Sequence, residues 1–116
     1  MQAQENMPEV LLKIIEALKE KQVEDLTILN LEGLVSYTDF FVIGTGKNLP
    51  HIQTLADTAA QIIKIPHVGG VRKEGGSSSN WILIDGGDFI LHLFLPNARK
   101  FYNLEELWED APRVEV

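Results

Sequence analysis

The sequence contains no cysteine, which excludes disulfide bonds, thiolate chemistry and cysteine-based zinc sites. It also lacks any apolar run near the roughly 18 residues that a membrane-spanning helix requires. Its first residues, MQAQENMPEV, do not show the basic segment followed by an apolar run that marks a secretory signal. These absences lead us to expect a soluble, cytoplasmic protein.

Basic residues are also in short supply. The chain has 10 Lys and Arg against 17 Asp and Glu, and its net charge is −7. Part of this charge lies at the C-terminal end, where residues 109–116 read as an acidic tail. Because proteins bind nucleic acid mainly through Lys and Arg that neutralise phosphates, we do not expect a surface for naked RNA or DNA. A basic protein partner suits this charge, and solubility alone is the alternative explanation.

The length of 116 residues and the 45% content of hydrophobic residues suit one domain with a single core. We predict that this domain spans residues 1–116 and that residues 1–7 are flexible. The apolar periodicity predicts a helix over 8–21, strands over 26–31 and 40–43, a helix capped by Asn48 and ended by Pro66, strands over 71–74, 81–85 and 88–95, and short helical segments begun by Asn97 and Asn103. A Gly/Ser tract over 75–79 reads as a mobile loop. This order predicts an α/β (α+β) fold in which helices cover a mixed sheet of about five strands.

Two apolar runs flank the Gly86-Gly87 pair, which predicts a two-residue hairpin turn with positive φ angles. Such a turn would place Asp85 opposite Asp88 and Trp81 opposite His92. One face of the hairpin would then be core: Ile82, Ile84, Phe89, Leu91, Leu93 and Leu95. The other face would carry Trp81, Leu83, Asp85, Asp88, Ile90 and His92, and these polar and aromatic residues need an explanation.

The chain also carries a spaced pattern, EG…W…D.GD…H.F….R.FY.LE.LW, over residues 74–108. Further matching segments lie upstream, at residues 38–43, 45–46 and 56–57. With this pattern the chain resembles the ribosomal silencing factor (Iojap) family over nearly its whole length. It departs from the family at Lys47-Asn48-Leu49-Pro50-His51, where the family usually has two small residues and an arginine.

The resemblance implies a nucleotidyltransferase-like fold and a role in negative regulation of translation and of ribosome biogenesis. Members of this family bind a basic protein of the large ribosomal subunit, number fourteen. They thereby block the joining of the small subunit and repress translation in starvation or stationary phase. The alternative is a degenerate nucleotidyltransferase-fold module that binds nucleotide or metal in regulation or ribosome assembly. Both interpretations leave open whether the chain forms a homodimer.

Catalysis is not predicted. The glycine turn Gly44-Thr45-Gly46-Lys47 lacks the remaining positions of a P-loop and of a dinucleotide fingerprint, and tight strand-to-helix packing explains its glycines. The strands offer no carboxylates one residue apart for magnesium; Asp85 and Asp88 come nearest. The three histidines have no partners at ligand spacing. We therefore predict no catalytic residue, cofactor or metal.

Recognition of a protein is the predicted activity. Trp, Tyr and Arg anchor interfaces most often, and the remaining candidates come from the hairpin face and from the family pattern. The predicted protein-binding residues are Tyr37, Asp39, Trp81, Asp85, Asp88, His92, Arg99, Tyr102 and Glu105. Four of these residues have an alternative role. Trp81 could be core and His92 a hydrogen-bonded structural histidine, while Asp85 and Asp88 could cap turn amides or bind a cation.

Overall fold

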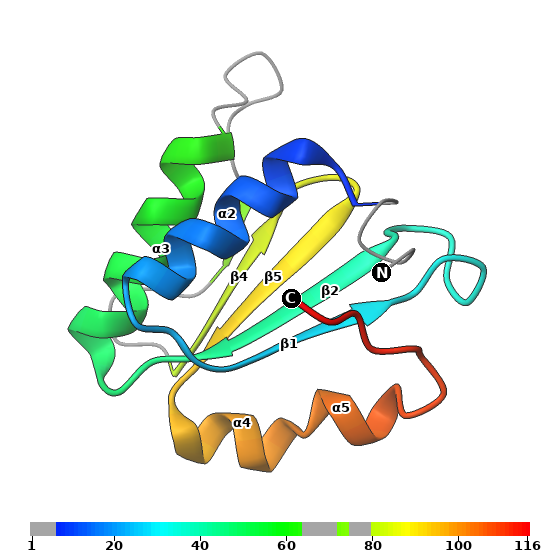
Figure 1. Cartoon of the computed structure of the whole chain (residues 1–116). Coiled ribbons are helices and arrows are strands. Elements are labelled where there is room, and N and C mark those ends of the chain that lie inside the picture. The colour runs from blue at the N-terminus through cyan, green and yellow to red at the C-terminus, as the bar shows by residue number, and fades with distance from the viewer. Residues whose placement is uncertain (1–6, 64–71, 75–79) are drawn as a thin grey trace.

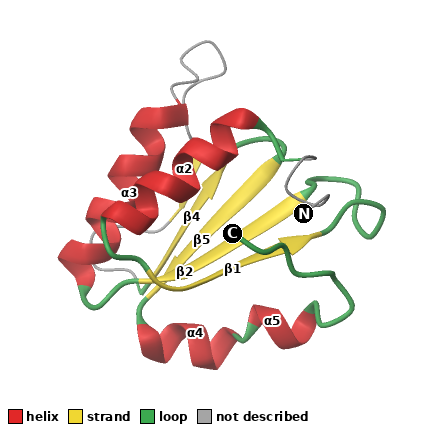
Figure 2. Ribbon diagram, in the orientation of Figure 1, coloured by secondary structure: helices red, strands yellow, loops and turns green. Residues whose placement is uncertain are grey.

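A computed structural model describes residues 7–63, 72–74 and 80–116 (Figure 1). Helices α2 and α3 pack on one face of a mixed sheet, and α4 and α5 lie against the other face (Figure 2). The elements in chain order are α2 (Glu9–Glu20), β1 (Glu24–Asn30), β2 (Phe40–Thr45), α3 (Leu49–Ile63), β3 (Arg72–Glu74), β4 (Trp81–Asp85), β5 (Phe89–Phe94), α4 (Pro96–Tyr102) and α5 (Leu104–Leu107). The predicted mixed sheet covered by helices is confirmed.

The strands follow the order β1-β2-β5-β4-β3. Strands β2 and β5 are parallel, and the other neighbouring pairs are antiparallel. All six residues of β2 are buried, as its continuous apolar run predicts for a central strand with both faces covered. β3 is a three-residue strand at the far edge, and the predicted Gly/Ser loop beside it lies outside the described residues.

The main core lies between the sheet and the α2–α3 layer. Helix α2 contributes Leu11, Ile14, Ile15 and Leu18, which recur at three- and four-residue spacing and so share one helix face. Met7, at the edge of the segment predicted to be flexible, is also buried in this core. At the start of α3, the Asn48 side chain accepts a hydrogen bond from the His51 amide (2.9 Å), so the predicted N-cap is confirmed. Pro66 lies outside the described residues.

The end of the chain packs against β1. The Asn30 amide donates to the Pro112 carbonyl (2.8 Å), and the Val114 amide donates to the Ile28 carbonyl (2.9 Å). The Val114 side chain is buried in the main core. Part of the segment predicted as an acidic tail therefore covers the outer edge of β1, where unpaired strand amides would otherwise face solvent.

The hairpin register differs from the prediction. Trp81 pairs with Phe94, Leu83 with His92 and Asp85 with Ile90, and the Gly86 amide donates to the Phe89 carbonyl (2.9 Å). The turn residues are thus Gly87 and Asp88, and the prediction of a Gly86-Gly87 turn, with Asp85 opposite Asp88 and Trp81 opposite His92, is wrong. Gly87 has the positive φ angle (+92°), whereas a Cβ atom on Gly86 would lie 2.5 Å from Cζ of Phe89. Gly86 is needed because the Phe89 ring packs on it.

The register shift is two residues, so the strand residues keep their predicted faces, while Asp88 lies in the turn. Ile82, Ile84, Phe89, Leu91 and Leu93 are buried in the main core, with Leu95 packed against it. A shift of one residue would have exchanged the faces, but an even shift preserves them because strand side chains alternate with period two. The core face of the hairpin is confirmed.

Of the two predicted helix starts near the C-terminus, Asn97 is wrong, and Asn103 is confirmed as the N-cap residue of α5. Helix α4 begins at Pro96, with Leu95 as its N-cap residue and no side-chain cap, because Pro already suits the first helical position. Asn103 takes a left-handed conformation (φ 47°), and its side-chain Nδ2 donates to Glu106 Oε1 (2.7 Å). The reciprocal capping box is not formed. Leu104 and Trp108 pack against a second cluster of buried residues, whereas Leu107 is exposed.

Candidate functional site

The predicted site residues lie in three separate regions. Trp81, His92 and Tyr102 meet at the junction of β4, β5 and α4. Arg99 and Glu105 join α4 to α5 and the sheet. The remaining four, Tyr37, Asp39, Asp85 and Asp88, lie at or near the other end of the sheet, where β2 and β5 begin and β4 ends. The nine residues therefore do not form one continuous site.

The first region is an aromatic cluster built by the hairpin register and by the tight link from β5 to α4. Trp81 lies opposite Phe94, and their rings stack at 5.0 Å between centroids. Because α4 starts only two residues after β5, its last residue, Tyr102, returns over the hairpin, and its ring lies 4.5 Å from that of Trp81. The cluster thus joins the sheet to the exposed end of α4.

His92 lies beneath this cluster and is only 4% exposed. Its Nδ1 accepts a hydrogen bond from Trp81 Nε1 (3.1 Å), and the Phe41 ring meets it edge-on at 4.5 Å between centroids. Burial lowers the pKa of His92 from 6.5 to about 4, because an apolar environment disfavours the charged form. At neutral pH the imidazole is uncharged and carries its proton on Nε2, which has no hydrogen-bond partner among the described residues.

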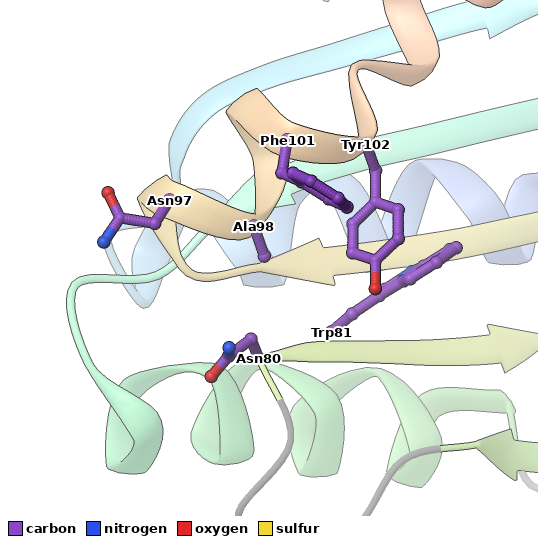
Figure 3. Close-up of a pocket in the computed structure, with 6 residues that line it drawn as sticks. All are labelled: Asn80, Trp81, Asn97, Ala98, Phe101 and Tyr102. Carbon is purple, nitrogen blue, oxygen red and sulfur yellow. The ribbon is translucent and has the colours of Figure 1, made fainter.

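A pocket opens between Trp81 and α4 (Figure 3). Its volume is about 530 Å³, and we call it the aromatic pocket; it is lined by Asn80, Trp81, Asn97, Ala98, Phe101 and Tyr102. Phe101 is 81% exposed and Tyr102 is 47% exposed, so two rings of its wall face solvent. Exposed aromatic side chains beside a pocket are typical of a protein-binding surface.

The second region is a partly buried polar cluster around Arg99. Arg99 donates to both carboxylate oxygens of Glu105, at 2.7 and 3.3 Å, and also to the hydroxyls of Thr45 (2.8 Å) and Thr27 (3.1 Å). The hydrogen bond from Arg99 lowers the pKa of Glu105 below its ordinary value, helped by the positive charges of Arg99 and Arg113 and by Thr27, while burial opposes this shift. These contacts fasten α5 to α4 and both helices to the sheet.

The third region contains the hairpin turn. Asp85 Oδ1 accepts a hydrogen bond from the Gly87 amide (2.9 Å), which is the turn-capping alternative for this residue. The Asp88 carbonyl accepts hydrogen bonds from the Asp39 and Phe40 amides at 2.9 and 3.3 Å. The Asp88 side chain and the Tyr37 ring are exposed. No three His, Cys, Asp or Glu side chains of the described residues gather closely enough to hold a metal ion.

Phe101, Asn80 and Asn97 line the aromatic pocket but were not predicted as site residues. Phe101 belongs to the sequence pattern that carries the family resemblance, so a signal existed for it. The two asparagines had no such signal, because only the fold of α4 back onto β4 brings residues 80 and 97 together. The helices of the described ranges include none that is long and apolar enough to cross a membrane.

Comparison with known proteins agrees with the resemblance. The model of the family described as "Ribosomal silencing factor during starvation" matches residues 4–116. The ribosomal silencing factor of Halalkalibacterium halodurans is 35% identical over 93% of this chain and 92% of that protein. A mouse protein named mitochondrial assembly of ribosomal large subunit protein 1 is 29% identical over 82% of this chain and 43% of its own length.

The fold agrees as well. A crystal structure of a protein from Bacillus halodurans superimposes with a TM-score of 0.77 at 34% identity, and the match covers 93% of this chain and 98% of that one. The names of the bacterial relatives describe regulatory silencing factors and not enzymes.

Proposed function

The chain belongs to the ribosomal silencing factor family, and from this premise we propose that it binds the large ribosomal subunit and sterically blocks the joining of the small subunit. The partner we propose is the basic large-subunit protein number fourteen. Translation would fall in starvation or stationary phase because joined ribosomes cannot form. The name of the mouse relative, which refers to assembly of the large ribosomal subunit, supports this choice of subunit.

The observation that carries the proposal is the aromatic cluster. Trp81, Phe101 and Tyr102 line an open pocket, and the chain around it has a net charge of −7. Exposed aromatic rings supply binding energy in a small area, while the negative charge steers the chain toward a basic surface and away from naked RNA. Both properties suit a compact factor that binds a basic protein on the ribosome.

The three regions would have different roles in this function. We propose that Trp81 and Tyr102 contact the partner and that His92 supports Trp81 from below. Tyr37, Asp39, Asp85 and Asp88 form a second surface that would add contacts to basic groups. Arg99 and Glu105 would act indirectly, since their charged groups are already paired with each other and hold α4 and α5 in place.

We further propose that residues 1–116 act as one domain of nucleotidyltransferase-like fold. The sheet between two helical layers supports this, as does the packing of both Met7 and Val114 into one core. Blocking by bulk needs no cofactor, because competition for a surface requires only differential binding to the free subunit.

Order of addition tests the proposed function. The chain, added to separated subunits before they are mixed, should sediment with the large subunit and suppress formation of joined ribosomes. It should saturate near one copy per large subunit and have little effect on ribosomes that are already joined. Equal inhibition of joined ribosomes, or a requirement for a nucleotide, would contradict steric blocking and favour a nucleotide-binding regulator.

A further inference from the structure

The aromatic pocket presents ring faces in several orientations. The rings of Trp81 and Tyr102 are inclined by 48°, and those of Tyr102 and Phe101 by 87°, with centroids 4.5 and 5.1 Å apart. Asn80 and Asn97 line the pocket on one side of the rings, to their left in Figure 3. The pocket residues identified among the described ranges are all uncharged, so a ligand meets ring faces and side-chain amides.

The polar edge of Trp81 is already in use. Its Nε1 donates to His92 Nδ1 on the buried side of the hairpin, and the Phe94 ring stacks on it, so the part of the Trp81 ring that lines the aromatic pocket is what a ligand can meet. Ring faces carry negative potential and attract cations. The carbonyl oxygen of an asparagine side chain accepts hydrogen bonds from N–H groups. The pocket therefore offers what a guanidinium group needs: flat surfaces to stack on and acceptors at the rim.

Charge distinguishes this ligand from the others that a pocket of this kind could take. A nucleotide would also stack on the rings, but its phosphates would meet a chain of net charge −7. A purely apolar side chain would leave the amides of Asn80 and Asn97 without a use. Arginine suits this pocket better than lysine because its planar guanidinium stacks on aromatic faces and is more weakly hydrated than an ammonium.

The neighbouring charged groups leave the pocket open to such a cation. Arg99 is paired with Glu105 at 2.7 Å and lines a different pocket. Lys100 and Glu106 line a further pocket, which shares Phe101 and Tyr102 with the aromatic pocket. From these observations we infer that the aromatic pocket accepts an arginine side chain of the basic partner, stacked against Trp81 and Tyr102. The inference rests on the proposed function, because that function supplies the basic partner.

A blocked Gly-Arg-Gly peptide is the probe, and the same peptide with citrulline in place of arginine is its uncharged, nearly isosteric control. The measurement is NMR titration of the intact chain, followed through the Trp81 indole N–H resonance. We expect saturable shifts with the arginine peptide and binding of the citrulline peptide weaker by about threefold or more, the size of a cation–π contact at an exposed site.

Three variants keep the inference falsifiable. Tyr102→Leu should weaken arginine-peptide binding by about threefold, whereas Tyr102→Phe should retain it, because the ring face and not the hydroxyl makes the contact. Leu34→Ala removes an exposed apolar side chain (48% exposed) that has no proposed binding role and should change nothing. Since Tyr102 is also exposed, these variants should fold, and their melting temperatures check that they do.

Equal binding of the citrulline and arginine peptides, or an unchanged affinity in Tyr102→Leu, would overturn the inference. The inference would also be overturned if AMP shifted the Trp81 resonance at a lower concentration than the arginine peptide does. Sedimentation of the wild-type chain with large subunits separates this failure from that of the proposed function. If the chain binds subunits but does not prefer the arginine peptide, only the inference about the pocket is refuted. If it prefers the arginine peptide but does not bind subunits, only the proposed ribosomal function is refuted.

Discussion

Trp81 donates its indole N–H to Nδ1 of His92 over 3.1 Å, although the two residues are not paired across the hairpin. His92 pairs with Leu83, so Trp81 reaches it diagonally from the position opposite Phe94. This hydrogen bond requires an uncharged imidazole, because a protonated Nδ1 cannot accept. A buried neutral histidine thus holds the indole whose face lines the aromatic pocket.

The state of His92 predicts how stability depends on pH. Its pKa is about 4 in the folded chain against about 6.5 in the unfolded chain, so the unfolded state binds more protons between these values. The free energy of unfolding should be highest above pH 6.5 and should decrease by about 3 kcal/mol as the pH falls to 4. Urea unfolding from pH 7.5 to 4 measures it. His92→Gln, which does not titrate, should flatten the curve between pH 6.5 and 4.5, and a wild-type curve that is already flat there would refute the prediction.

Replacing Tyr102 tests whether the large subunit binds at the aromatic cluster or at the end of the sheet that carries the hairpin turn. We expect Tyr102→Ala to weaken binding to the large subunit by about 2 kcal/mol, the loss typical of an interface anchor, with little change in melting temperature because the ring is 47% exposed. Tyr37→Ala is the matched variant at the other end and should cost less. A larger loss for Tyr37→Ala would move the main contact to the end with Asp39 and Asp88.

Removing Arg99 should destabilise the fold. Arg99→Met leaves the Glu105 carboxylate without the hydrogen bonds that lower its pKa, and we expect a loss of about 2 kcal/mol in the free energy of unfolding. Adding Glu105→Gln to this variant should restore part of the loss, because the second change removes the unpaired charge. Urea unfolding of the two single variants and the double variant gives the coupling. Strictly additive losses would mean that the pair does not act as a unit.

Replacing Gly86 tests whether the hairpin turn needs a glycine at this position because the Phe89 ring packs on it. Gly86→Ala places a methyl group where a Cβ atom would lie 2.5 Å from the Phe89 ring, and the forced displacement of a core ring should cost about 1–3 kcal/mol. Chemical denaturation measures the cost. Gly33→Ala is a contrasting variant: Gly33, unlike Gly86, has a positive φ (+83°), and nothing lies within 4 Å of the added atom, so it reports backbone strain without a clash. A Gly86→Ala variant as stable as the wild-type chain would show that packing on Phe89 is not the reason for Gly86.

Salt should weaken binding to the large subunit. With a net charge of −7, the chain should lose affinity as salt rises from about 50 mM to several hundred, because exposed charge pairs are screened over about 10 Å at 0.1 M. Cosedimentation at stepped salt concentrations measures this. Affinity that does not change with salt would indicate that ring contacts alone carry the complex.

Much of the fold was predictable because it depends on local patterns. The spacing of Leu11, Ile14, Ile15 and Leu18 predicted helix α2, and Asn48 predicted the start of α3. The unbroken apolar run from Phe40 to Ile43 predicted a central strand. Of the candidate site, the rings of Trp81 and Tyr102 and the family pattern around them were also visible, but neither their contact nor the pocket between them was.

The sequence by itself determined which residues of the hairpin face the core and which face α4, because alternation with period two survives an even shift in register. The tertiary structure decided the rest. It chose the Gly87-Asp88 turn, since the Phe89 ring packs on Gly86 and no local rule records that contact. It also brought Thr27 and Thr45 to Arg99, over 72 and 54 residues of chain, and Tyr102 to Trp81. Such contacts depend on where whole elements pack, and side-chain periodicity within one element holds no information about its distance from another.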